Sequence, residues 1–266
     1  ALEGQEIEVS VTATLQGEPA DAEMIGSLTF TLAHENGVTV YEDISLVDGK
    51  LDVSELVKGT YTVTASDSRF DSATLVVDGV SAEITVNMPR YRVASGSGAV
   101  IGDDGVTFNS AWDSVTTVDV FDENIAGENY MVEFTLKMPN NSGDWFTRAI
   151  FTMGTSDDSG FIVINNGSVY FAKGFGAYDT IGTEIKTDSH GFVAASQAGL
   201  PVRLVRSGAT VRLYMDFGEG YQLVHTLTIA GESDARFAVS VTNNDADVSI
   251  SGVSVYEYVE SVAPDV

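Results

Sequence analysis

The chain has 266 residues, of which 44% are hydrophobic, and this length accommodates two domains with separate cores. Its 39 Asp and Glu residues outnumber its 13 Lys and Arg residues, and the formal net charge of -26 repels phosphate backbones, which excludes nucleic acid as a partner. The sequence has no cysteine, which excludes a thiolate nucleophile, a cysteine-ligated metal and any disulfide.

Short runs of alternating polar and apolar residues dominate the first third of the chain. Such period-two alternation predicts strands that bury one face and expose the other. The predicted strands are residues 7–13, 28–32, 38–41, 61–65, 73–77 and 83–86. Turn residues such as Asp48-Gly49 and Asp78-Gly79 separate some of them. About seven short strands at this spacing predict a small Ig-like, prealbumin-like sandwich.

A break in this pattern falls at Pro89-Arg90, and a Gly/Ser-rich stretch runs from Ser95 to Gly98. No internal repeat relates the two sides of the break. We therefore predict two different modules, residues 1–89 and residues 90–266, joined by a very short linker.

Several segments of the first module carry a family resemblance: residues 9–14, 17–20, 28–32 and, above all, 56–64. They resemble the Cna B-type and transthyretin-like sandwich modules that serve as stalks in bacterial surface proteins. The resemblance implies that this module acts as a spacer.

Some members of that family carry an isopeptide cross-link between a lysine and an asparagine, formed with the help of an acidic residue. This sequence has Thr12 or Ala13 where the lysine is expected, and Ala65 where the acid is expected. Asn87 lies near the expected asparagine position. We therefore predict no cross-link in this module.

The second module shows strands and hairpins of its own. Residues 130–137 alternate so that one face consists of apolar side chains, which we expect in the core: Tyr130, Val132, Phe134 and Leu136. Asn166-Gly167 predicts a tight hairpin turn, and Ser207-Gly208 predicts a second. The predicted strands are residues 105–108, 130–137, 160–164, 168–171, 202–205, 210–214, 236–241 and 248–256. This number of antiparallel strands predicts a two-sheet jelly roll.

The order of these elements is similar to that of the concanavalin A-like, laminin-G-type jelly rolls. The residues that carry the resemblance are 129–134, 160–164, 167–171, 201–206, 212–216 and 252–256. Such folds occur as carbohydrate-binding modules and as accessory domains of polysaccharide-degrading enzymes. The resemblance implies an architecture more specifically than it implies a ligand.

Catalytic residues are not evident in either module. Retaining glycosidases need two carboxylates about 5 Å apart, yet no Glu-x-Asp-x-x-Glu string occurs, and we expect the lone acids Asp119 and Glu133 to face solvent. His34, His190 and His225 are isolated from one another in the sequence. We therefore predict that the chain is not an enzyme, and a catalytic domain elsewhere in the parent protein remains open.

Two polar stretches of the second module carry the tryptophans. Sugar binding needs a flat aromatic ring against the C–H face of the sugar, with carboxylates, amides or guanidinium groups at the hydroxyls. The candidate ligand-binding residues are Trp112, Asp144, Trp145, Arg148 and Tyr178. The alternative is that one or both tryptophans close an end of the hydrophobic core.

Acidic pairs in the same module supply the oxygen ligands that calcium prefers. The candidates are Asp157, Asp158, Asp245 and Asp247, and laminin-G-type folds often carry one structural calcium ion. None of these stretches forms a continuous calcium loop, so solvated loops are the alternative.

These features predict a non-catalytic carbohydrate-binding or adhesion segment of a larger secreted or cell-surface bacterial protein. We expect a glycan or polysaccharide ligand, a monomeric fragment and an extracellular location. No run approaches the roughly 18 apolar residues of a membrane span, so we expect no membrane insertion. The alternatives are a purely structural stalk segment and accessory domains of a polysaccharide-degrading enzyme.

Overall fold

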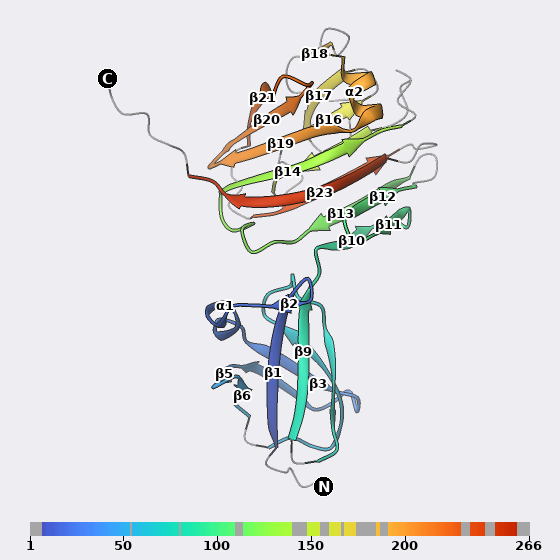
Figure 1. Cartoon of the computed structure of the whole chain (residues 1–266). Helices are drawn as coiled ribbons and strands as arrows, with labels where there is room; N and C mark the ends of the chain where they lie inside the picture. Colours follow the sequence, from blue (N-terminus) through green and yellow to red (C-terminus); the bar gives the residue numbers. More distant parts are fainter. Residues whose placement is uncertain are drawn as a thin grey trace, which may run out of the picture. The chain divides into compact units, whose positions relative to one another are not determined.

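The computed structural model describes residues 7–53, 55–79, 81–109, 114–139, 148–154, 160–165, 168–173, 185–186, 191–229, 235–242 and 248–259. For Arg148, Thr242 and the strands between residues 160 and 186, the description covers the backbone alone. The chain forms two compact units, Ala1–Arg90 and Tyr91–Val266 (Figure 1). The structure confirms the predicted all-β class, a small sandwich followed by a jelly-roll β-sandwich. Within the described residues, every helix is too short to cross a lipid bilayer.

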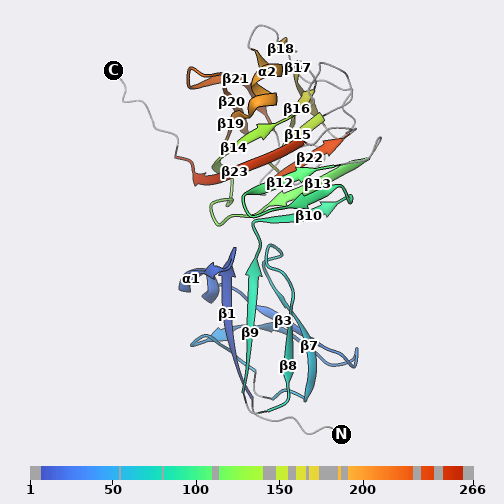
Figure 2. The ribbon, with the colours of Figure 1, turned by 45° about the vertical axis from the view of Figure 1, so that its right-hand side comes forward.

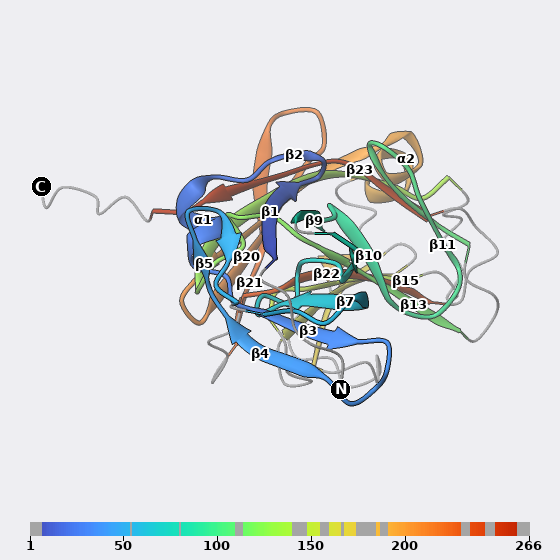
Figure 3. The same cartoon turned by 90° about the horizontal axis from the view of Figure 1, so that it is seen from below.

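The described part of the first unit has two sheets and one short helix. One sheet has the order β2-β1-β6-β5, with β9 also paired to β1, and it comprises β1 (Glu8–Leu15), β2 (Glu18–Pro19), β5 (Leu46–Val47), β6 (Lys50–Leu51) and β9 (Ser81–Met88). The other sheet has the order β4-β3-β7-β8, and it comprises β3 (Phe30–His34), β4 (Val40–Ile44), β7 (Gly59–Ala65) and β8 (Ala73–Val77). In Figure 3, β4 lies beside β3 at the edge of this sheet. The helix α1 spans Ala22–Gly26.

The core of the first unit contains a tyrosine with a fixed hydroxyl. The Tyr61 side chain is fully buried, and its hydroxyl donates a hydrogen bond to the Val57 carbonyl at 2.8 Å. His34 packs edge-on against its ring at 4.8 Å. Burial raises the pKa of Tyr61 to about 12, with a further raising contribution from Tyr41. Tyr61 therefore stays neutral at ordinary pH.

A glycine makes room for the histidine at this point of the core. Gly59 has φ +145°, and a Cβ atom there would lie 2.2 Å from His34 Nε2, so only glycine fits. The His34 Nδ1 atom accepts a hydrogen bond from the Asn36 amide, which leaves Nε2 to donate to the Lys58 carbonyl at 3.2 Å. The Gly-Thr-Tyr step of β7 is thus fixed by its fit to His34 and by the tyrosine hydroxyl.

The positions that bear on the isopeptide prediction lie on β1, β7 and β9. Ala13 and Ala65 are both buried alanines. Strands β1 and β9 run parallel, and Thr14 is aligned with Asn87. The Asn87 Oδ1 atom accepts hydrogen bonds from Thr14 Oγ1 at 2.8 Å and from the Gly17 amide at 3.1 Å. The Asn87 side chain therefore helps to hold the turn between β1 and β2.

Among its described residues, the second unit has two seven-stranded sheets and one short helix, and the two layers are visible in Figure 2. The first sheet, here called the β22 sheet, has in spatial order β10 (Tyr91–Ser95), β13 (Val115–Val120), β22 (Phe237–Thr242), β15 (Arg148–Thr152), β16 (Gly160–Asn165), β17 (Ser168–Lys173) and β18 (Ile185–Lys186). The second, the β14 sheet, has β11 (Ala99–Ile101), β12 (Gly105–Phe108), β23 (Val248–Glu257), β14 (Asn129–Lys137), β19 (Leu200–Ser207), β20 (Thr210–Asp216) and β21 (Tyr221–Thr228). The helix α2 spans Phe192–Ala198.

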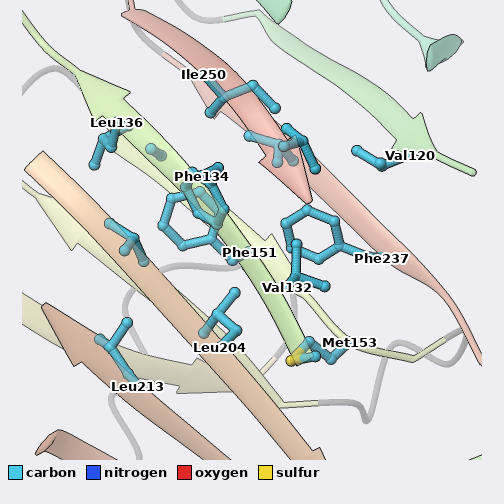
Figure 4. Close-up of a cluster of buried hydrophobic side chains, with 14 of the residues drawn as sticks. Val120, Val132, Phe134, Leu136, Phe151, Met153, Leu204, Leu213, Phe237 and Ile250 are labelled. Atoms are coloured by element: carbon cyan, nitrogen blue, oxygen red, sulfur yellow. The ribbon is translucent and has the colours of Figure 1, made fainter. Parts of the chain in front are cut away.

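Aromatic side chains fill the space between these two sheets. The predicted core face of β14 is buried, which confirms the alternation: Tyr130, Val132, Phe134 and Leu136. The Phe134 ring lies 4.9 Å from the Phe151 ring and 5.8 Å from the Phe237 ring, centroid to centroid (Figure 4). Burying each such side chain contributes about 1.5–3 kcal/mol. The contact therefore joins the two sheets through their central strands.

A buried arginine also connects the sheets. Arg206 lies on the inward face of β19, opposite Tyr130 and Val211, and its side chain has no exposed surface. Its Nη1 atom donates to the Met153 carbonyl at 2.9 Å, just beyond the end of β15 in the other sheet. A buried cation requires such partners because desolvation of the charge is costly.

We expect the substitution Arg206→Ala to destabilise the second unit by about 2–3 kcal/mol, since it leaves a cavity and unsatisfied carbonyl groups. Urea unfolding followed by tryptophan fluorescence measures this unit selectively, because both tryptophans belong to it. The control Lys137→Ala, at an exposed end of β14, should change the stability by less than about 0.5 kcal/mol. Equal stability of both variants would contradict a connecting role for Arg206.

We expect the first unit to lose stability as pH rises from about 10 to about 12. The pKa of Tyr61 is about 12 in the folded state against 10.0 ordinarily, so the unfolded chain releases the proton first and deprotonation favours unfolding. Calorimetric unfolding of the chain across this range measures the effect. The Tyr61→Phe variant lacks this titration. Above pH 10 its free energy of unfolding should therefore fall less steeply with pH than that of the wild type. Parallel pH curves would contradict the assignment.

Candidate functional site

Most of the sequence-predicted site residues lie outside the described residues. These are Trp112, Asp144, Trp145 and Tyr178 among the ligand candidates, and Asp157, Asp158, Asp245 and Asp247 among the calcium candidates. Arg148 is described by its backbone alone. It is the first residue of β15, rather than part of a loop, and it is paired with Thr242 and Asn165.

Arg148 belongs to a row of paired residues that runs across the β22 sheet, and five strands begin or end in this row. Val115 is paired with Thr242, Thr242 with Arg148, Arg148 with Asn165, and Asn165 with Ser168. The segments flanked by this row are 110–113, 140–147, 166–167 and 243–247. The topology therefore gives these four segments anchors at one edge of the sheet.

The same end of the β14 sheet supplies the remaining anchors. Phe108, at the end of β12, is paired with Val248, at the start of β23. Only six residues separate Phe108 from Val115, and five separate Thr242 from Val248. Because packed sheets lie about 10 Å apart, such short connections join strand ends at one end of the sandwich. We call this end the loop edge.

The segments that contain the predicted site residues are flanked by strand ends from both ends of the sandwich. The segments that carry Trp112, Asp144 and Trp145 are flanked by the loop edge, as is the segment of Asp245 and Asp247. The segment of Asp157 and Asp158 is flanked by the opposite end, because Thr152 is paired with Phe161. The segment of Tyr178 begins at that opposite end, where Lys173 is paired with Gly160, and ends at β18, beside the start of β17.

An arginine–glutamate pair on the outward face of the β14 sheet was not predicted from the sequence. Glu133 of β14 lies directly opposite Arg203 of β19. The Arg203 Nε and Nη2 atoms both donate to Glu133 Oε1, at 2.6 Å and 2.5 Å. The guanidinium carbon stands 4.0 Å from the centre of the Tyr221 ring of β21, a cation–π contact. The prediction that Glu133 points away from the core is confirmed. Its partner Arg203 could not be predicted, because the pairing depends on the register between β14 and β19.

The outward face of the β22 sheet is closed to solvent at its centre. Its outward side chains are at most 4% exposed: Thr117, Ile150, Thr152, Ala238 and Ser240. Thr117 and Ser240 satisfy each other with a hydrogen bond of 2.8 Å. Asp119, farther along this face, receives two hydrogen bonds from Arg236. The acids that we expected to face solvent, Asp119 and Glu133, are thus each bound to an arginine.

A shallow depression of about 340 Å³ lies at the end of the sandwich opposite the loop edge. Its lining is acidic and amide-rich: Glu123, Asn124, Ala126, Gly127, Glu128, Asn129 and Glu257. In the part of the chain that the structure describes, no three His, Asp or Glu side chains are grouped as metal ligands. The depression therefore offers hydrogen-bonding groups without a described metal centre.

Comparison with known proteins gives likenesses among solved structures. No protein-family model and no curated protein matches the chain. The VIP36 exoplasmic/lumenal domain in its Ca²⁺/Man3GlcNAc-bound form has 9% identity and a TM-score of 0.47, over 67% of this chain and 87% of that one. The carbohydrate binding module CBM66 from Bacillus subtilis has 16% identity and a TM-score of 0.46, over 63% and 96%. Arcelin-5, a lectin-like defense protein from Phaseolus vulgaris, has 12% identity and a TM-score of 0.44, over 62% and 91%. At these values the likenesses assign no ligand to this chain.

The contact between Arg203 and Tyr221 predicts that removal of the Arg203 charge changes the pKa of Tyr221. Burial raises the pKa of Tyr221, Glu133 raises it further, and Arg203 lowers it. Because the cation favours the tyrosinate, the substitution Arg203→Met should raise this pKa further. A ¹³C NMR titration of the tyrosine Cζ signals, with Tyr221→Phe to assign the resonance, measures the change. The control Arg236→Met, on the other sheet, should leave the Tyr221 signal unchanged, and an equal shift in both variants would contradict the contact.

Proposed function

We propose that the second unit is a non-catalytic carbohydrate-binding module of a larger secreted or cell-surface bacterial protein. In this proposal the first unit is a Cna B-type or transthyretin-like spacer without an isopeptide cross-link. The observation that carries the proposal is the shared row of strand ends: the segments of Trp112 and Trp145, 33 positions apart in the sequence, are flanked by the same end of one sandwich.

The residue types at the loop edge suit a sugar ligand. Indole rings bind the apolar C–H face of a sugar ring, and Asp144 and Arg148 provide a carboxylate and a guanidinium group for hydroxyls. Tyr178 belongs to the proposed site as a third aromatic residue, although its segment starts from the opposite end. Segments held by a rigid sandwich are a frequent place for ligand contacts.

A structural calcium ion is compatible with the same edge. Asp245 and Asp247 fall within the segment 243–247, which also contains two asparagines. Carboxylate and amide oxygens are the ligands that calcium prefers. The proposed sugar contacts are made by the protein side chains and do not depend on the ion.

We expect Trp112→Ala and Trp145→Ala each to weaken glycan binding at least about tenfold, because each removes a stacking surface. A glycan array with the intact chain identifies a ligand, and calorimetric titration of that ligand gives the affinities. The matched control is Tyr41→Ala, which removes a half-buried aromatic ring from the first unit and should leave the affinity unchanged.

The alternative of a purely structural stalk makes the opposite prediction. In that case no glycan on the array binds, and acrylamide does not quench either tryptophan because both rings are buried in the core. Efficient quenching of the wild type, reduced when the glycan is added, is the result expected for a carbohydrate-binding module.

A further inference from the structure

The outward face of the β14 sheet carries aromatic and charged side chains in one continuous area. Glu133, Arg203 and Tyr214 stand in directly paired positions of β14, β19 and β20. Tyr221 reaches this row from β21, because its ring lies under the Arg203 guanidinium. Tyr256 stands on the neighbouring strand β23 and is 45% exposed. The side chains at the centre of this outward face are partly exposed, whereas those at the centre of the outward face of the β22 sheet are buried.

The arginine–glutamate pair on this face is oriented by its hydrogen bonds but does not use all of its hydrogen-bonding atoms. Arg203 uses Nε and Nη2, and Glu133 uses Oε1. Within the described part of the chain, Arg203 Nη1 and Glu133 Oε2 have no hydrogen-bond partner. The two side chains are 33% and 23% exposed. The pair thus keeps one unused donor and one unused acceptor on an oriented scaffold, which suits hydrogen bonds to the hydroxyl groups of a sugar chain.

The tyrosines add stacking surfaces and further hydroxyl groups. The hydroxyls of Tyr214, Tyr221 and Tyr256 make no hydrogen bond to any described residue. A tyrosine presents an apolar ring and a polar tip, so it contacts both the C–H face and the hydroxyls of a sugar. Rings on three strands extend the area across the strand direction, which suits a chain of sugars better than a single residue.

The charge balance of the face points to an uncharged ligand. Glu133 is balanced by Arg203, and Asp216 lies on the same strand as Arg212, whereas the whole chain has a net charge of -26. A polyanion, and equally a second copy of this chain, would meet the strong repulsion of that field. A neutral polysaccharide meets no such repulsion.

We propose that the outward face of the β14 sheet, centred on Glu133, Arg203 and Tyr221, binds an uncharged polysaccharide chain. The Arg203 Nη1 and Glu133 Oε2 atoms bind hydroxyl groups of the sugar chain, while the rings of Tyr214 and Tyr256 contact C–H faces. This inference rests on the proposed carbohydrate-binding role, but it uses residues distinct from those at the loop edge.

Affinity electrophoresis of the intact chain tests the proposal. The gels contain galactomannan, hydroxyethylcellulose, mixed-linkage β-glucan or levan, with polygalacturonate as the charged comparison. We expect retardation by at least one uncharged polymer and not by polygalacturonate. Glu133→Gln and Tyr221→Ala should each weaken binding about tenfold, whereas Tyr221→Phe, which keeps the ring, should weaken it less. The matched control is Asp119→Asn, which disrupts the corresponding ion pair with Arg236 on the other sheet and should leave the affinity unchanged.

Including Trp145→Ala in the same gels separates the two proposals. Loss of binding in Trp145→Ala, with wild-type affinity in Glu133→Gln and Tyr221→Ala, would overturn this inference and leave the loop-edge site intact. Loss in the Glu133 and Tyr221 variants alone would support the sheet face and count against the loop edge. Absence of retardation of the wild type by every uncharged polymer would overturn this inference, whereas the loop-edge proposal fails only if the glycan array also shows no ligand.

Discussion

The second unit depends on the packing of two antiparallel sheets through their central aromatic residues. Phe134 on one sheet contacts both Phe151 and Phe237 on the other, and this contact determines which face of each strand is buried. Because side chains alternate along a strand, fixing Phe134 inward also fixes Glu133 outward. The register of β14 with β19 then places Arg203 opposite it. The surface chemistry of this sheet is therefore a consequence of its core, since a slip of one residue would exchange the two faces.

The two sheets differ because only one of them is covered on both sides. Ile150 and Ser240 point away from the aromatic core, yet they are 1% and 0% exposed, so the centre of the β22 sheet resembles an interior layer. On the β14 sheet the corresponding outward positions hold Glu133 and Arg203, which keep part of their surface in water. A ligand can therefore approach the β22 sheet at its edges, where strands end, and the β14 sheet across its face. The loop edge and the sheet face are different kinds of surface on one scaffold.

The sequence predicts a strand correctly where one face of the strand is buried and the other is exposed to solvent. This holds for residues 130–137 and for residues 210–214, which were both predicted as strands. β15 was missed because Ala149 through Met153 is buried on both faces, which removes the period-two signal. β21 was missed for the opposite reason, since only one of its eight residues is buried and a register shift interrupts its pairing with β20. The helices α1 and α2 have five and seven residues, too few for a helical stripe. Candidate residues such as Trp145 could be proposed from the composition of a polar stretch, but the pair of Glu133 with Arg203 requires the register, which single-strand patterns do not contain.

The ion pair between Glu133 and Arg203 matters more for the orientation of its side chains than for the stability of the fold. Exposed pairs contribute about 0–1 kcal/mol, because water screens them and two long side chains lose freedom. Arg203 and Glu133 are partly exposed, so their contribution to folding is correspondingly small. Arg206, by contrast, is fully buried and hydrogen-bonded to Met153, which makes it a structural residue. The planar guanidinium of Arg203 contacts both a carboxylate and the Tyr221 ring, and these contacts restrict its rotation before any ligand arrives. A ligand that binds there gives up less side-chain entropy, and this preorganisation is the physical reason that a weakly stabilising pair can matter for recognition.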